Sequence, residues 1–180
     1  MRSIQTFQFT LVLKHLPENI NNLEDSLFEA GCDDALINFR NGAVYLDFDR
    51  DASSLEEAVV SAIKNIQSID AEVASIAPDN LVTESEIAKR LQVTRQTVSL
   101  WIKGKRRRSF PYPVMRLAEK SPLWKWTEVT EWLYDNKIID DKNLVENALF
   151  FVNINAALEE RDGRMREMRH NLLERISFHG

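Results

Sequence analysis

The sequence has few of the residues that build disulfides, metal sites and membrane spans. It contains one cysteine, Cys32, and three histidines that lie far apart. An internal disulfide and a cysteine-based zinc site are therefore excluded. The apolar runs are only a few residues long, too short for a bilayer-spanning helix. The N-terminus lacks a basic stretch followed by an apolar region, so no secretory signal is expected. We expect a cytoplasmic protein without a metal or another cofactor.

The net charge of −5 conceals a segregation of charge along the chain. Residues 1–80 hold 5 basic and 14 acidic side chains and carry −9, whereas residues 81–130 hold 11 and 4 and carry +7. Residues 131–180 hold 7 and 10 and carry −3. A basic segment inside an acidic chain is typical of nucleic-acid binding. The central segment is therefore the first candidate for function.

Residues 1–78 show the pattern of a small α+β domain. Apolar residues two apart from Phe7 to Leu13 predict a strand. Asn22 is expected to cap a helix that ends at Gly31. Asn41-Gly42, a strong hairpin signal, separates two predicted strands at 35–40 and 43–48.

The second half of this domain repeats the pattern. Ser54 and Glu57 form a capping-box sequence that opens a second helix, and residues 71–77 predict a last strand. The resulting order is strand, helix, strand, strand, helix, strand. This is the ferredoxin-like βαββαβ arrangement, a four-stranded sheet with both helices on one face.

Two groups of acids accompany these elements: Asp33 and Asp34 after the first helix, and Asp47, Asp49 and Asp51 after the third predicted strand. They suggest either a divalent-metal or acid–base site, or a solvated loop rim with Asp51 favoured by the dipole of the second helix. No histidine, nucleophile pattern or glycine-rich loop accompanies them, which favours the rim. Cys32 lies among these acids, and its thiolate is disfavoured there. We therefore expect an inert thiol and no enzyme activity.

The most informative stretch begins at Leu81. Thr83 and Glu86 form a capping box that opens a helix with Ile87, Ala88 and Leu91 on its buried stripe. Gln92-Val93 then makes a tight turn, and Thr94 caps a second helix over about residues 95–103. Two short helices joined in this way predict a helix-turn-helix.

The stretch LVTESEIAKRLQVTRQTVSLWIKG resembles the helix-turn-helix of bacterial transcription regulators. The following segments Phe110-Pro111-Tyr112-Pro113-Val114 and Leu123-Trp124-Lys125-Trp126, then Val129 and Trp132-Leu133, are similar to the MerR-like or excisionase-like (AlpA-type) winged helix-turn-helix. The resemblance covers about residues 81–135. It implies a DNA-binding domain at 81–136, a small β wing with its turn at 119–122, and a third helix that closes the core.

Major-groove recognition needs side chains that reach base edges from the start of the second helix. Arg95 suits guanine and Gln96 suits adenine, while Thr94 could instead place its hydroxyl, or the free N–H groups of the helix, on a phosphate. The cations after this helix would follow the backbone or enter the minor groove. The predicted DNA-binding residues are Thr94, Arg95, Gln96, Thr97, Ser99, Lys103, Lys105, Arg106, Arg107, Arg108, Tyr112, Arg116, Lys120 and Lys125.

Other interpretations of this segment remain open. The tryptophans Trp101, Trp124, Trp126 and Trp132 could stack on single-stranded bases, although a small domain needs at least three of them for its core. Lys89 and Arg90 fit a solvated helix face better than base contacts. The run from Lys105 to Arg108 could be a solubility feature or a localisation signal.

Residues 140–178 predict a helical segment with apolar stripes. The first stripe comprises Leu144, Ala148, Phe151, Val152, Asn155 and Leu158, and the second comprises Met165, Met168, Leu172 and Ile176. We expect these stripes to meet a partner, first of all a second copy of the chain, because symmetric regulators read paired half-sites. The alternative is packing on the chain's own N-terminal sheet.

These patterns predict a sequence-specific regulator of transcription that binds double-stranded DNA, acts as a repressor and associates with the bacterial nucleoid. One alternative is an antitoxin-type autoregulator whose N-terminal domain or C-terminal helix masks a partner protein. Another is an excisionase-like architectural factor that bends DNA. No membrane partner is expected.

Overall fold

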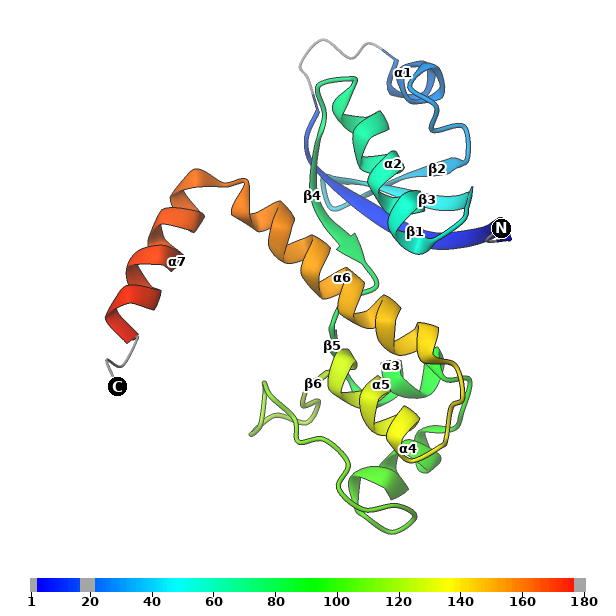
Figure 1. Cartoon of the computed structure of the whole chain (residues 1–180), viewed down its shortest axis with the longest axis vertical. Helices are drawn as coiled ribbons and strands as arrows, with labels where there is room; N and C mark the ends of the chain where they lie inside the picture. Colours follow the sequence, from blue (N-terminus) through cyan, green and yellow to red (C-terminus); the bar gives the residue numbers. More distant parts are fainter. Residues whose placement is uncertain (1–2, 17–21, 177–180) are drawn as a thin grey trace. The chain divides into compact units, whose positions relative to one another are not determined.

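The computed structural model describes residues 3–16 and 22–176 and shows an α+β protein. Its residues form two compact units (Figure 1). The first comprises the chain up to Pro78 together with the residues from Asn153 onward, and the second runs from Asp79 to Val152. The predicted helical segment at 140–178 has its last two positions outside the described residues.

The first unit is built on a four-stranded antiparallel sheet in the order β2-β3-β1-β4. The predicted succession of strands and helices is confirmed: β1 (Gln5–His15), α1 (Leu23–Glu29), β2 (Ala35–Arg40), β3 (Ala43–Ala52), α2 (Leu55–Gln67) and β4 (Glu72–Ala77). Helix α2 lies across one face of the sheet (Figure 1), where Val59 and Ile66 are fully buried together with Leu11 of β1.

The three aspartates predicted to follow the third strand lie within it. The two-residue period of β3 continues to Ala52, so these acids are exposed on the open face and Arg50 is buried. Strand β1 places a hydrogen-bond donor opposite each acid, and the pairs are Asp47–Thr10 (2.6 Å), Asp49–Gln8 (2.8 Å) and Asp51–Thr6 (2.6 Å). The prediction that these acids line a loop was wrong. It relied on the rarity of aspartate in strands, and the cross-strand hydrogen bonds outweigh that local preference here.

Local signals for turns and caps hold in most places. Asn41 and Gly42 have φ values of 52° and 81°, and they form the predicted hairpin turn. Ser54 caps α2 by accepting a bond from the Glu57 amide (3.2 Å), but the Glu57 carboxylate bonds to Ser53 instead of closing the box. Asn22 is the N-cap residue of α1 without a side-chain cap bond.

The second unit combines short helices with a two-stranded sheet. Its elements are β5 (Leu81–Val82), α3 (Glu84–Arg90), α4 (Arg95–Ile102), β6 (Trp124–Lys125), α5 (Trp126–Asp135) and the start of α6 (Lys142–Glu160). Strands β5 and β6 pair antiparallel, and an isolated bridge joins Met115 to Leu123. The capping box of Thr83 and Glu86 is present at α3, and Gln92, with φ of 55°, makes the turn before α4.

The core of the second unit is aromatic. All four tryptophans are between 3% and 7% exposed, which confirms the interpretation that they are core residues. Trp101 contacts Trp132 with ring centroids 5.7 Å apart. Ala148 of α6 joins the same cluster, so this core needs a residue well beyond α5.

The C-terminal helices differ in what they contact. In the first unit, the Asn155 side chain of α6 donates to the Ile76 carbonyl of β4 and accepts from its amide, both at 2.8 Å. Leu158 of α6 is also buried. Helix α7 (Gly163–Ile176) buries no residue, and its Arg169 pairs with Glu159 and Glu160. None of the described helices is both long and apolar enough to cross a bilayer.

A buried arginine ties the first unit together. Arg50 makes a two-pronged bond to Asp34 (2.7 and 2.8 Å) and also donates to the Gly31 carbonyl (2.8 Å). Its guanidinium reaches Ser61 and Asn65 of α2 and lies 4.9 Å from the centre of the Phe48 ring. One side chain therefore fixes the loop after α1 to β3 and α2.

Removing this guanidinium should destabilise the first unit. Arg50→Met keeps the aliphatic stem but leaves Asp34 and the other acceptors without their donor, so we expect a loss of about 3 kcal/mol in the free energy of unfolding. Urea denaturation followed by far-UV circular dichroism measures it. Arg40→Ala, at an exposed position of β2, is the control and should change stability by less than about 0.5 kcal/mol. A similarly small effect of Arg50→Met would contradict the role assigned to this network.

Candidate nucleic-acid interface

Helix α4 presents two different faces. Val98 is fully buried and Trp101 is 5% exposed, whereas Arg95 and Gln96 at the first turn are exposed to solvent. The helix is thus held from one side by the aromatic core, and its N-terminal side chains remain available to a ligand.

The hydroxyls of Thr94 and Thr97 bond within the first turn of α4. Thr94 caps the helix by accepting from the Thr97 amide at 3.2 Å, and the hydroxyls of Thr94 and Thr97 lie 2.9 Å apart. Thr97 and Ser99 are half-buried. Within the described part of the chain, the backbone N–H groups of Arg95 and Gln96 have no acceptor, as is usual for a first helical turn.

The cations after α4 form an exposed segment, Lys103–Arg108, here called the cationic loop. Its five charged side chains are exposed, and no acid in residues 3–16 or 22–176 forms an ion pair with them. Gly104, the second residue of the loop, has φ of 64°, and its amide bonds to the Trp101 carbonyl at 2.9 Å. The loop therefore offers unneutralised positive charge next to α4.

The remaining predicted contacts lie between Phe110 and α5. Tyr112 is 87% exposed, and Lys120 is exposed. Arg116 lies 4.0 Å from Glu119, and Lys125 lies 3.1 Å from Glu128. The charges of Arg116 and Lys125 are therefore partly offset by neighbouring acids.

Arg90 differs from its sequence-based interpretation as part of a solvated face. Its guanidinium lies 5.0 Å from the centre of the Trp126 ring, and its Nη1 atom is buried without a hydrogen-bond acceptor among the described residues. Burial lowers the pKa of Arg90 below its usual value. The aromatic ring explains the burial, because a cation is attracted to the ring face. Lys89 is exposed, as predicted.

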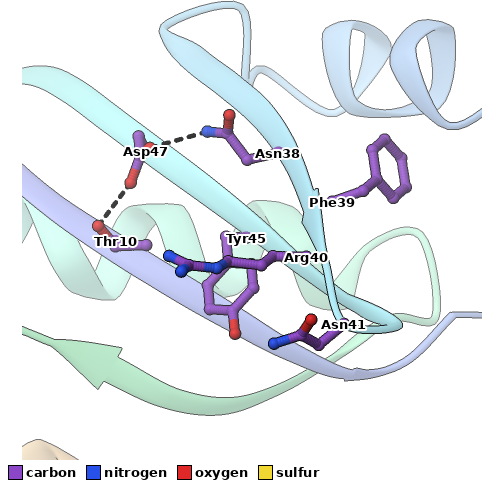
Figure 2. A pocket seen from close by; sticks show the side chains of 7 residues that line it. All are labelled: Thr10, Asn38, Phe39, Arg40, Asn41, Tyr45 and Asp47. Carbon is purple, nitrogen blue, oxygen red and sulfur yellow. Dashed lines mark hydrogen bonds between the residues drawn. The ribbon is translucent and has the colours of Figure 1, made fainter.

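The open face of the four-stranded sheet has a hollow that is a second candidate for a binding site. Figure 2 shows Asp47 accepting bonds from Thr10 and from Asn38 (2.8 Å), one at each carboxylate oxygen. The hollow measures about 550 Å³, and Phe39, Arg40, Asn41 and Tyr45 complete its lining. No histidine or cysteine is among these residues, and Asp47 serves the cross-strand bonds.

Cys32 lies in the first unit beside the Arg50 network. It is 3% exposed, and burial raises the pKa of its thiol. Arg50 nearby acts in the opposite direction but does not overcome the burial. These observations agree with the prediction of an unreactive thiol.

Several tertiary contacts of this unit carry no recognisable sequence signal. The indole N–H groups of Trp124 and Trp132 donate to the Pro111 and Arg108 carbonyls, at 3.1 and 3.0 Å. A tryptophan in a sequence indicates burial but does not show where its N–H points. The stacking of Arg90 on Trp126 joins residues far apart in the chain and was missed for the same reason.

No protein-family model, characterised protein or solved structure matches this chain.

The thiol environment leads to a direct test of Cys32. Because its thiolate is disfavoured and its side chain is buried, we expect it to react with a disulfide reagent at pH 8 about tenfold or more slowly than in urea. Ser68→Cys in a Cys32→Ser background supplies an exposed thiol as control, since Ser68 is exposed. Equal rates for the two thiols in the folded protein would contradict the assignment.

Proposed function

We propose that the protein is a transcription regulator that binds double-stranded DNA in a sequence-specific manner and acts as a repressor. In this proposal α3, its turn and α4 form a helix-turn-helix, with α4 in the major groove. The observation that carries it is the pair of exposed residues Arg95 and Gln96 on a helix whose other face is anchored in the core. A major groove admits such a helix, and arginine and glutamine suit guanine and adenine edges.

The cationic loop supplies the sequence-independent part of binding. Its exposed, unpaired cations would neutralise phosphates and release counterions. The loop between Met115 and Leu123, which carries Arg116 and Lys120, would be the wing of a winged helix-turn-helix. The burial of all four tryptophans argues against a single-strand binder that stacks bases on them.

The first unit fits a separate role in this proposal. Its strand order β2-β3-β1-β4 is the order of a ferredoxin-like domain. Its net charge is negative and therefore repels DNA. Asp47, Asp49 and Asp51 line its open face. A role in assembly or partner binding therefore suits this unit better than DNA contact.

Helix α7 is the part that would join two copies. Met165, Met168, Leu172 and Ile176 are 44% to 63% exposed and follow each other at intervals of three, four and four residues. Antiparallel pairing with a second copy would match Met165 with Ile176 and Met168 with Leu172, so the stripe is complementary to itself. A two-fold dimer would read two half-sites.

Salt dependence and point variants test DNA binding. After selection of bound sites from random duplexes, we expect affinity to fall by about three decades between about 50 and 200 mM salt, as about six phosphate contacts require. Arg95→Ala should cost about 1–3 kcal/mol on the selected duplex and relax preference at one base pair. Arg106→Ala with Arg107→Ala should weaken binding to all duplexes alike. Fluorescence anisotropy measures each.

The exposed Arg40 provides the control, and Arg40→Ala should leave binding unchanged. Neutral behaviour of both Arg95→Ala and the paired loop variant would show that the groove assignment is wrong. Equal affinity for every duplex together with DNA bending would indicate an architectural factor instead of a regulator.

The oligomeric state tests the assignment of α7. Met168→Glu with Leu172→Glu places two charges in the proposed helix pair, so light scattering should show the mass of a single chain where the unaltered protein shows two. His170→Glu, on the opposite side of α7, should leave the dimer intact. An unaltered protein that is monomeric at all concentrations would overturn the self-pairing.

A further inference from the structure

The cationic loop has its far end fixed by the core of the second unit. The Trp132 indole of α5 donates its N–H to the Arg108 carbonyl at 3.0 Å. Phe110, 7% exposed, sits edge-on to the Trp132 ring with centroids 4.8 Å apart and to the Trp124 ring at 6.5 Å. The Trp124 indole donates to the Pro111 carbonyl at 3.1 Å. The chain is therefore held on both sides of Phe110.

The near end of the loop is fixed as well. The amides of Gly104 and Lys105 bond to carbonyls of α4 at 2.9 Å each. Between these ends lie Arg106 and Arg107, whose side chains have no ion-pair partner among the described residues. The backbone that carries these cations is thus held at both ends.

The conformation at the far end needs such an anchor. Ser109 has φ of 60°, in the left-handed region that a serine rarely adopts without support. Local preference does not explain this conformation, because asparagine or glycine would suit it better. The hydrogen bond to the preceding carbonyl and the insertion of Phe110 after it supply the tertiary constraint.

We infer that Trp132 is a positioning residue for phosphate binding: its indole N–H holds the Arg108 carbonyl and thereby presents the cations of the loop in a pre-ordered arrangement. This inference rests on the proposed DNA-binding function. Pre-ordering lowers the entropy lost when the loop meets phosphates. Trp132 therefore acts through Arg106, Arg107 and Arg108 without touching DNA.

Trp132→Phe tests this inference because it keeps an aromatic ring and removes the N–H. The control is Trp126→Phe, a residue buried to a similar extent whose indole N–H has no hydrogen-bond partner among the described residues. The probe is a labelled mixed-sequence duplex of about 30 base pairs, titrated with the full chain in a salt series. We expect Trp132→Phe to weaken binding about three- to tenfold and to make the dependence of log affinity on log salt shallower by about one phosphate contact.

A combined variant separates positioning from general loss of stability. In a background of Arg106→Ala, Arg107→Ala and Arg108→Ala, the three arginines that Trp132 is inferred to position are gone and only Lys103 and Lys105 remain in the loop. Trp132→Phe should then have almost no further effect on affinity. Additive losses in the two backgrounds would overturn the inference. Equal salt dependence of Trp132→Phe and Trp126→Phe would overturn it as well.

A variant outside the core covers the case in which Trp132→Phe does not fold. Ser109→Val leaves the tryptophans intact but disfavours the left-handed backbone at the exposed end of the loop, because a β-branched residue rarely adopts a positive φ. It should therefore also make the salt dependence shallower. If the unaltered chain binds the duplex and Ser109→Val leaves the salt dependence unchanged, positioning is wrong but DNA binding stands. If the unaltered chain ignores the duplex even in dilute buffer, the proposed function fails as well.

Discussion

The insertion of Phe110 between Trp124 and Trp132 is the contact on which the second unit depends. A unit of this size encloses little volume, and large aromatic side chains fill it with few residues. A buried indole also carries an N–H donor, which most often pairs with an acceptor. For Trp124 and Trp132 the acceptors are carbonyls on either side of Phe110. Packing of the core and the course of the charged loop are therefore parts of one arrangement.

In the first unit a polar side chain, Arg50, joins segments that few apolar contacts hold together. Its sheet and α2 bury aliphatic side chains, but the loop after α1 contributes few of them. Arg50 donates hydrogen bonds to acceptors in that loop and in α2, and its guanidinium lies over the Phe48 ring. A buried guanidinium is tolerated only when its donors are matched. Asp34 therefore stabilises the fold through its bonds to Arg50.

The parts of the fold that could be predicted are those with local causes. The capping box at Thr83, the turn at Asn41-Gly42 and the alternation in β1 each depend on residues within a few positions, and the structure has all three. Strand β3 was predicted too short because its aspartates are stabilised by β1, some 40 residues earlier. The sequence indicates the low strand propensity of aspartate, but it does not show which residue of β1 lies opposite each aspartate.

The candidate site divides in the same way. The exposure of Arg95 and Gln96 follows from helical spacing within α4 and could be anticipated. The ion pair of Lys125 with Glu128, three residues apart, had a local signal that the prediction did not use. The anchoring of the cationic loop by Trp132 joins positions 24 residues apart, and no periodicity reveals it.

Helix α6 changes how the chain can be divided. It contributes Ala148 to the aromatic core and, further along the same helix, Asn155 to the edge of β4. The first unit is consequently discontinuous along the chain. A fragment that ends near Asn136 would lack Ala148, so one side of the aromatic cluster would be exposed. A fragment that ends at Pro78 would lack Asn155, so the Ile76 amide would lose its hydrogen-bond acceptor. A gene rearrangement that transfers either unit intact to another protein would therefore have to include α6.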